Sequence, residues 1–228
     1  MVNVYDYDLL KRLSATPYTT QRNLAQDCGL SVGMINKSLQ RLVSEGYLNE
    51  HMGLTHKTNQ LLIEKKPKNA IILAAGFGMR MVPINVEAPK ALLKVKGQTL
   101  IERLIKQLQE AGIYEIYVVV GFMKERFEYL IDAYGVKLVI NPEYATKNNL
   151  HSLKQVISRI SNSYIIPCDL WCRTNPFSNC ELYSWYMVSD QTDSYSHIRV
   201  NKKRMLVPTK ETDPGNQMLG ICYLEESK

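Results

Sequence analysis

The sequence predicts an α/β protein whose sheet is mostly parallel and covered by helices on both faces, preceded by a small helical domain. In the second part of the chain, short apolar segments alternate with amphipathic ones, a pattern typical of parallel sheets. The first part instead has helical periodicity. A charged stretch containing Pro67 separates the two parts. We therefore expect a helical domain at 1–63, a linker at 64–69 and an α/β domain at 70–228.

The overall composition is that of an ordinary globular protein, with 45% hydrophobic and 22% charged residues. The longest apolar runs are too short to span a bilayer. The N-terminus carries acidic residues and lacks the basic region followed by an apolar region that a signal peptide has. Five scattered cysteines favour reduced thiols over a disulfide framework. The net charge of +6 favours nucleic acid, nucleotides or phosphorylated substrates as partners. We therefore expect a cytoplasmic protein with no membrane partner.

The helical domain has a characteristic order of elements. A short amphipathic helix opens it, a second helix ends at a turn over 28–30, and a third is capped by Ser31. The stretch 47–58 is predicted to form a short two-stranded wing. This order resembles the winged helix-turn-helix family over residues 3–63.

The third helix of this domain is amphipathic. Its apolar face carries Val32, Ile35, Leu39, Leu42 and Val43, and the opposite face carries Asn36, Lys37, Gln40 and Arg41. The resemblance implies that this helix enters a DNA major groove, with Asn36, Lys37 and Gln40 facing base edges. The alternative is that the polar face is solvated or packs on a partner domain.

The α/β domain is predicted to alternate strands and helices in order. Buried apolar runs predict strands at 70–75, 114–122, 136–141 and 162–171, and amphipathic periodicity predicts helices at 99–113, 124–135 and 148–160. Ligands in such sheets bind at the carboxyl ends of the strands. Gly76, Gly121, Asn141 and Asp169 follow strands, so we expect them along one edge of the sheet.

The first of these strands leads into a glycine-rich turn, "AAGFGMR", which contains Gly76, Gly78 and Arg80. Met81 stands where a dinucleotide-binding fingerprint has its third glycine, and no P-loop pattern is present. Glycines at such a turn let backbone N–H groups approach phosphate closely. A second basic motif, Pro89–Lys90, follows before the next helix.

The combination "LAAGFGMR…PKALLKVKGQTLIER", followed by "YVVVGF" and "CDLW", resembles the nucleotidyltransferases that activate phosphorylated small molecules with an NTP. Within that family, "NPEYATKNNLHSL" and the short region after Asp169 are most similar to bacterial phosphocholine cytidylyltransferases. The resemblance covers residues 69–228. It implies a Rossmann-like, GT-A-like domain that forms CDP-choline and pyrophosphate from CTP and phosphocholine, supported by Mg²⁺.

The resemblance also implies residue roles. The nucleotide-binding set is Ala74, Ala75, Gly76, Gly78, Asn148, Asn149 and Ser152. Arg80 and Lys90 are the catalytic cations, which neutralise charge on the phosphates. The attacking phosphate is already an anion, so the reaction requires no general base. Asn148 and Asn149 equally fit a purely structural role as helix caps.

Asp169 stands where the family places a Mg²⁺ ligand, and a strand-end cap is the structural alternative. The preceding Cys168 departs from the family pattern and suits a neutral, small filler. The second acidic ligand of the family lies further along than this chain extends. We therefore expect a C-terminal truncation, with a further domain in the full-length protein, and a truncated chain need not be active.

The head-group site is implied at Tyr195 and Tyr223, because aromatic faces bind a quaternary ammonium. Tyr195 replaces an expected Trp, and Leu224 replaces an aromatic residue. An incomplete cage leaves room for a primary-amine substrate such as phosphoethanolamine or 2-aminoethylphosphonate. The same chemistry on another phosphorylated substrate, for example a sugar 1-phosphate with a different NTP, is a further alternative. A different class also stays open: a DNA-binding regulator whose transferase-like domain only senses nucleotide.

Overall fold

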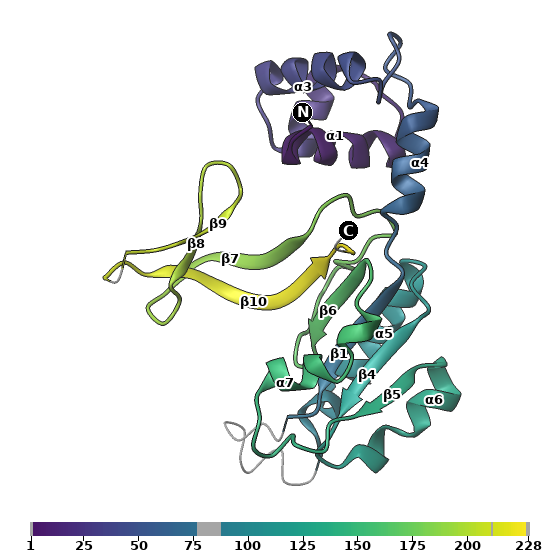
Figure 1. The fold of residues 1–228 in the computed structure, drawn as a ribbon, viewed down its shortest axis with the longest axis vertical. Helices are drawn as coiled ribbons and strands as arrows, with labels where there is room; N and C mark the ends of the chain where they lie inside the picture. Colours follow the sequence, from purple (N-terminus) through teal and green to yellow (C-terminus); the bar gives the residue numbers. More distant parts are fainter. Residues whose placement is uncertain (1, 77–87, 211, 227–228) are drawn as a thin grey trace. The chain divides into compact units, whose positions relative to one another are not determined.

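The computed structural model describes residues 2–76, 88–210 and 212–226, and its elements are labelled in Figure 1. The chain divides into two compact units. The first consists of residues 1–66 together with two segments from far along the sequence, Cys180–Tyr183 and Val200–Leu206, and the second contains the rest. Predicted sites that fall in 77–87, including Gly78 and Arg80, lie outside the described residues.

The first unit contains four helices, each started by a polar residue that accepts a hydrogen bond from the first helical turn. They are α1 (Val4–Ala15), α2 (Gln21–Cys28), α3 (Val32–Ser44) and α4 (His56–Glu64), with N-caps Asn3, Thr20, Ser31 and Thr55. The helices pack around fully buried leucines of α1 and α3, and Leu182 joins the same core.

The wing is shorter than predicted. Strand pairing is limited to a single bridge between Leu48 and Leu54. Thr55 then caps α4, so the stretch expected to complete the wing is helical from His56. The local capping signal of Thr55 therefore outweighs continued strand pairing there.

Two residues of α3 lie differently from the prediction. Arg41 does not belong to a solvated polar face, because its guanidinium contacts the carboxylate of Asp6 at 2.7 Å, and Asp6 is fully buried. Val32 was predicted to face the core, yet 43% of its surface is exposed. The Asp6 carboxylate also accepts a hydrogen bond from the Asn3 N–H at 2.8 Å, which completes the capping box of α1.

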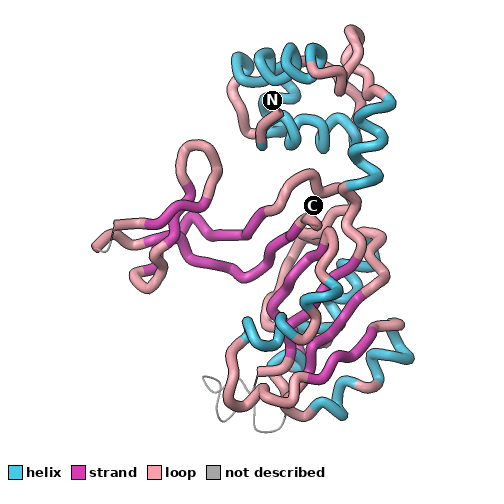
Figure 2. Tube along the Cα trace, viewed as in Figure 1, coloured by secondary structure: helices cyan, strands magenta, loops and turns pink. Residues whose placement is uncertain are grey.

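The second unit is built on a six-stranded sheet in the order β5-β4-β1-β6-β10-β7. The parallel strands are β1 (Asn69–Ala74), β4 (Ile116–Val120), β5 (Lys137–Ile140) and β6 (Ser163–Pro167). Two longer strands, β7 (Trp185–Asp193) and β10 (Gly215–Leu224), pair antiparallel and extend as the ribbon visible in Figure 2. The mostly parallel α/β sheet is as predicted.

Helices cover both faces of the sheet, because its strands are apolar on both sides. On one face, Ile72 and Val118 pack with α5 (Leu100–Glu110) and α6 (Tyr129–Tyr134). On the other, Ile71 and Val119 pack with the region of α7 (Asn149–Lys154). The helix predicted at 148–160 is interrupted after Lys154 and resumes as the 3-10 turn η5 (Ile157–Arg159).

Short elements complete this half of the sequence. They are η3 (Lys90–Leu92), η4 (Lys124–Phe127), the hairpin β2 (Lys94–Val95) with β3 (Gln98–Thr99), and the hairpin β8 (Ile198–Val200) with β9 (Leu206–Pro208). No helix in the described part of the chain is both long and apolar enough to cross a bilayer.

Candidate functional site

The candidate site lies where the carboxyl ends of β1 and β6 meet in the second unit. After β1 the chain forms β4 and β5 on one side of it, then returns to place β6 on the other side. In open α/β sheets, ligands generally bind beside the carboxyl ends of the strands at such a reversal of strand order, here the ends of β1 and β6. The predicted glycine turn follows β1, and Asp169 follows β6.

The sheet edge is held together by backbone hydrogen bonds beyond the strands. The Cys168 N–H donates to the Leu73 carbonyl at 3.3 Å, and the Phe122 N–H donates to the Ala75 carbonyl at 3.2 Å. The Asn141 N–H donates to the Val120 carbonyl at 2.8 Å. The four strand ends are therefore adjacent, as the sequence predicted.

Ala74 and Ala75 are buried at the end of β1, whereas Gly76 is exposed. Of the turn itself, only this first glycine belongs to the described residues. The buried alanines position the backbone from which the turn leaves the sheet.

Lys90 and Asp169 come together at this edge. Lys90 opens η3 directly after Pro89, and its ammonium pairs with the Asp169 carboxylate. Each side chain is about one-third exposed, at 32% and 33%. The structure thus brings the predicted catalytic cation and the predicted metal ligand into direct contact, although they are 79 positions apart in sequence.

The donor set at this edge fits one mode of Mg²⁺ binding. Among the described residues, no group of three His, Cys, Asp or Glu side chains gathers as a complete ligand cage. Mg²⁺ in nucleotide enzymes usually takes one or two carboxylates together with substrate phosphates and water. The single carboxylate of Asp169 suits a metal that arrives on a triphosphate.

Cys168 is chemically quiet beside this pair. Burial, and next the neighbouring Asp169 charge, raises the pKa of its thiol to about 12. The side chain therefore stays neutral at physiological pH, consistent with the predicted small filler.

A second group of residues lies at the ends of β4 and β5. Asn141 is buried, donates from its amide to the Ser152 hydroxyl at 3.0 Å, and accepts from the Glu143 N–H at 3.0 Å. Gly121 is required here, because a Cβ at this position would lie 2.5 Å from the Tyr144 Cβ. The sequence reasoning missed Tyr144, which the aromatic residue three positions after Asn141 in "NPEY" could have indicated.

Of the two predicted asparagines, Asn148 has a clear structural role as a helix cap. The Asn148 side chain caps α7 by accepting hydrogen bonds from Leu150 N–H and His151 N–H, at 3.1 and 3.4 Å. Asn149 is exposed in the first turn of α7. Ser152 is buried and bonded to Asn141. Contact of these residues with nucleotide stays a prediction.

The two predicted head-group tyrosines are not brought together. Tyr223 is fully buried in the core, with its ring 5.3 Å from that of Tyr164. Tyr195 is 90% exposed, beyond the Asp193–Gly215 pair of the ribbon. Tyr223 pairs with Trp185, eight positions along β10 from Gly215, which corresponds to roughly 26 Å of strand. Only Tyr195 is therefore accessible to a head group.

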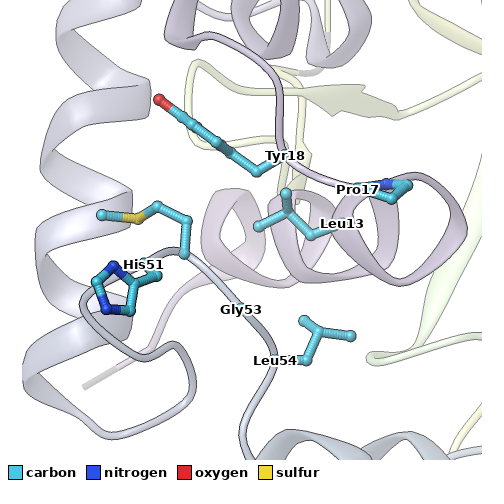
Figure 3. A pocket seen from close by; sticks show the side chains of 7 residues that line it. Leu13, Pro17, Tyr18, His51, Gly53 and Leu54 are labelled. Atoms are coloured by element: carbon cyan, nitrogen blue, oxygen red, sulfur yellow. The ribbon is translucent and has the colours of Figure 1, made fainter.

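The first unit presents the predicted DNA-facing residues on α3. Asn36, Lys37 and Gln40 are all exposed. Asn36 and Gln40 line a hollow of about 380 Å³, with Gln21, Leu39, Val43, Ser44, Glu50 and Met52. A further cavity of about 370 Å³ in this unit contains none of the predicted site residues (Figure 3). Its lining is Leu13, Pro17, Tyr18, His51, Met52, Gly53 and Leu54.

The open, mostly parallel sheet and the lysine–aspartate pair at the reversal of strand order are typical of an α/β nucleotide-binding domain of the nucleotidyltransferase class. The MobA-like NTP transferase domain family matches residues 70–177, and the winged helix-turn-helix DNA-binding family matches residues 3–49. The structure of the CTP:phosphocholine cytidylyltransferase from Streptococcus pneumoniae is similar, with 34% identity and a TM-score of 0.64. That match covers 70% of this chain and 72% of the other. The chain therefore belongs to the nucleotidyltransferase family that includes these cytidylyltransferases.

Two curated relatives are also named as cytidylyltransferases. The choline-phosphate cytidylyltransferase of Streptococcus pneumoniae is 47% identical over 110 residues, which are 48% of each chain. The 2-aminoethylphosphonate cytidylyltransferase of Lancefieldella rimae is 43% identical over 102 residues, 44% of this chain and 42% of the relative. This chain thus spans about half the length of the curated relatives that it matches.

Proposed function

We propose that this protein transfers the cytidylyl group of CTP to phosphocholine, forming CDP-choline and releasing pyrophosphate. The observation that carries the proposal is the meeting of Lys90 and Asp169 at the ends of β1 and β6. The nucleotide and the class of acceptor are taken from relatives that are named as cytidylyltransferases.

In the proposed reaction, a phosphate oxygen of the acceptor attacks the α-phosphorus of CTP, and the bond to the pyrophosphate oxygen breaks. The attacking oxygen is an anion at neutral pH, so the site needs to bring two anions together rather than remove a proton. Lys90 would neutralise the phosphates, and backbone N–H groups of the turn after Ala75 would hold the triphosphate. Arg80 is proposed to bind the β- and γ-phosphate oxygens through its two-pronged guanidinium.

Asp169 is proposed to hold Mg²⁺ together with the triphosphate. When bound, the ion would screen the charge that develops on the leaving pyrophosphate. The contribution of this chain is one carboxylate oxygen donor at the end of β6, positioned by the Cys168–Leu73 backbone hydrogen bond.

The head group is the least constrained part of the proposal. Tyr195 offers an exposed aromatic face that would attract a quaternary ammonium. A primary amine is the second candidate, because one relative is named for 2-aminoethylphosphonate. Phosphoethanolamine has the same amine on a phosphate ester.

The test is release of pyrophosphate with CTP, UTP and dTTP, each combined with phosphocholine, phosphoethanolamine, 2-aminoethylphosphonate or a sugar 1-phosphate. We expect CTP with phosphocholine to give the highest kcat/KM. An equal rate with UTP would contradict the cytidylyl assignment, and a faster rate with an amine would reassign the head group. CTP binding without release of pyrophosphate from CTP in the presence of any of these acceptors would instead favour the nucleotide-sensing regulator.

A second candidate function, DNA binding by the first unit, is supported by the family match at residues 3–49 and by exposed Lys37 and Gln40 on α3. We expect a mobility shift with DNA from the protein's own operon. The shift should be lost in Lys37→Ala/Gln40→Ala. The same substitutions at exposed Lys66 and Gln60 should leave it unchanged. A shift that survives the α3 variant would exclude this helix as the reading element.

A further inference from the structure

The ion pair between Lys90 and Asp169 joins two groups that the proposed reaction uses separately. Lys90 is needed as a free cation for phosphate, and Asp169 is needed as a free carboxylate for metal. Among the described residues, each is the other's only ion-pair partner. In the nucleotide-free protein the two charges therefore neutralise one another.

The backbones that carry the pair are fixed. On the Lys90 side, the Leu92 N–H donates to the Pro89 carbonyl at 2.9 Å, and the Leu93 N–H donates to the Lys90 carbonyl at 3.2 Å. On the Asp169 side, Cys168 is bonded to the end of β1. The partly exposed side chains can separate without rearrangement of the strands that hold them.

We propose that Lys90 acts as an internal counter-ion that occupies the metal-binding carboxylate until nucleotide arrives, so that metal and nucleotide bind together rather than metal first. This inference rests on the proposed function. A divalent ion arriving alone must displace the Lys90 ammonium from Asp169 and leaves that ammonium without an anion. A metal that arrives with a triphosphate brings phosphate oxygens to receive it.

The exchange leaves each of the two side-chain charges with a partner of opposite sign. The ammonium moves from a carboxylate to a phosphate, and the divalent ion takes its place on the carboxylate, with no proton transferred. Metal and nucleotide are therefore expected to raise each other's affinity by the same factor, as linkage requires. Part of that factor comes from Lys90.

The test uses Mn²⁺, a paramagnetic substitute for Mg²⁺ with the same preference for carboxylate oxygen. Free and bound Mn²⁺ are measured by electron paramagnetic resonance on the whole protein without nucleotide. We expect Lys90→Met to bind Mn²⁺ about tenfold more tightly than the wild type, because an adjacent cation disfavours a second cation by at least this factor. Asp169→Asn added to Lys90→Met should remove the gain.

The matched control is Lys94→Met, which removes the same charge from an exposed position on β2. It should bind Mn²⁺ like the wild type. Lys90→Gln provides a second, polar replacement, and thermal melting checks that each variant is folded. Equal Mn²⁺ affinity in the wild type, Lys90→Met and Lys90→Gln would overturn the inference, as would failure of all these proteins to bind Mn²⁺.

A second measurement separates this inference from the proposed function. Adding CTP should raise the Mn²⁺ affinity of the wild type, and the rise should be smaller in Lys90→Met. If the wild type binds neither CTP nor its Mn²⁺ complex, the proposed function fails. The Mn²⁺ affinities of the wild type and Lys90→Met without nucleotide still show whether Lys90 competes with metal for the Asp169 carboxylate. If CTP raises Mn²⁺ affinity equally in both proteins, the counter-ion role is excluded even though nucleotide binds.

Discussion

An aspartate paired with a basic side chain occurs in both units, and the two pairs have different surroundings. In the first unit, Asp6 is fully buried, contacts Arg41 and also completes the capping box of α1. In the second, Asp169 is one-third exposed at the end of a strand, and Lys90 is its only ion-pair partner among the described residues. Removing one partner of a buried pair leaves an uncompensated charge and destabilises the fold, whereas a partly exposed pair at a strand end adds little to stability and can exchange partners. The difference predicts that one pair controls stability and the other controls chemistry.

The largest effect is expected from Lys90→Ala. The loss of a cation that stabilises the phosphates should lower pyrophosphate release by about 100- to 1000-fold. Thermal stability should stay within a degree or two of wild type, since the pair is partly exposed. Lys94→Ala is the control for charge. A large drop in Tm with Lys90→Ala would assign this pair to the fold instead.

The corresponding change in the first unit is Arg41→Met. It leaves the buried Asp6 carboxylate without its cation, which should cost about 3 kcal/mol of unfolding free energy. Urea unfolding followed by circular dichroism measures it, and Arg22→Met on the exposed surface of α2 serves as the control. Nucleotide transfer at a temperature where the variant is folded should be unchanged. Stability equal to that of Arg22→Met would show that the Asp6 pair contributes nothing.

Gly121→Ala tests the packing between the end of β4 and the segment after β5 without removing a charge. Its Cβ would lie 2.5 Å from the Tyr144 Cβ, so the segment after β5 has to move. Overpacking of this kind typically costs about 2 kcal/mol of unfolding free energy. If the segment that contains Tyr144 lines the nucleotide site, the Kd for CTP should also rise. Tyr144→Gly added to Gly121→Ala should recover part of the stability. Unchanged stability in the single variant would mean that the two segments adjust freely.

At the carboxyl-end edge of the sheet, the sequence predicted the features that depend on local pattern and missed the contact that depends on strand order. Gly76, Asn141 and Asp169 were placed correctly, because each follows an apolar run that is long enough to be a buried strand. The contact between Lys90 and Asp169 depends on the strand order, which periodicity does not contain.

The failures have local and long-range causes. Strands β7 and β10 have partly buried residues along most of their length, so they show no alternation of apolar and polar side chains that would identify them. The wing was predicted too long because the N-cap of Thr55 was not recognised. Arg41 was misplaced because its partner is on another helix, 35 positions away.

Asn148→Ala distinguishes a cap from a ligand contact at the same edge. Loss of the hydrogen bonds to Leu150 and His151 N–H should cost about 1 kcal/mol. If capping is its whole role, CTP affinity measured by calorimetry stays at the wild-type value. Asn149→Ala, which removes no capping hydrogen bond of α7, should then leave stability unchanged. A weaker CTP affinity in Asn149→Ala alone would assign the nucleotide contact to Asn149.

The smallest effect on stability is expected from the exposed ion pair between Glu115 and Lys137. This pair contains no buried charge and no predicted ligand. Hydrogen bonds from Lys137 at 2.8 Å and from Tyr117 at 2.7 Å hold the pKa of Glu115 below its ordinary value. A lowered pKa means that the folded state binds the proton less readily than the unfolded state, so the stabilisation is complete above the unfolded pKa and is lost as pH falls through the folded one. Glu115→Gln should therefore lower Tm at pH 7 by at most about 2 °C, and the difference from wild type should shrink as the pH is lowered from 7 to about 3. Calorimetric melting at the two pH values measures this, with Glu125→Gln on η4 as the exposed control. If the difference persisted at pH 3, packing of the side chain rather than its charge would be the cause, and exposure alone would not separate weak pairs from strong ones.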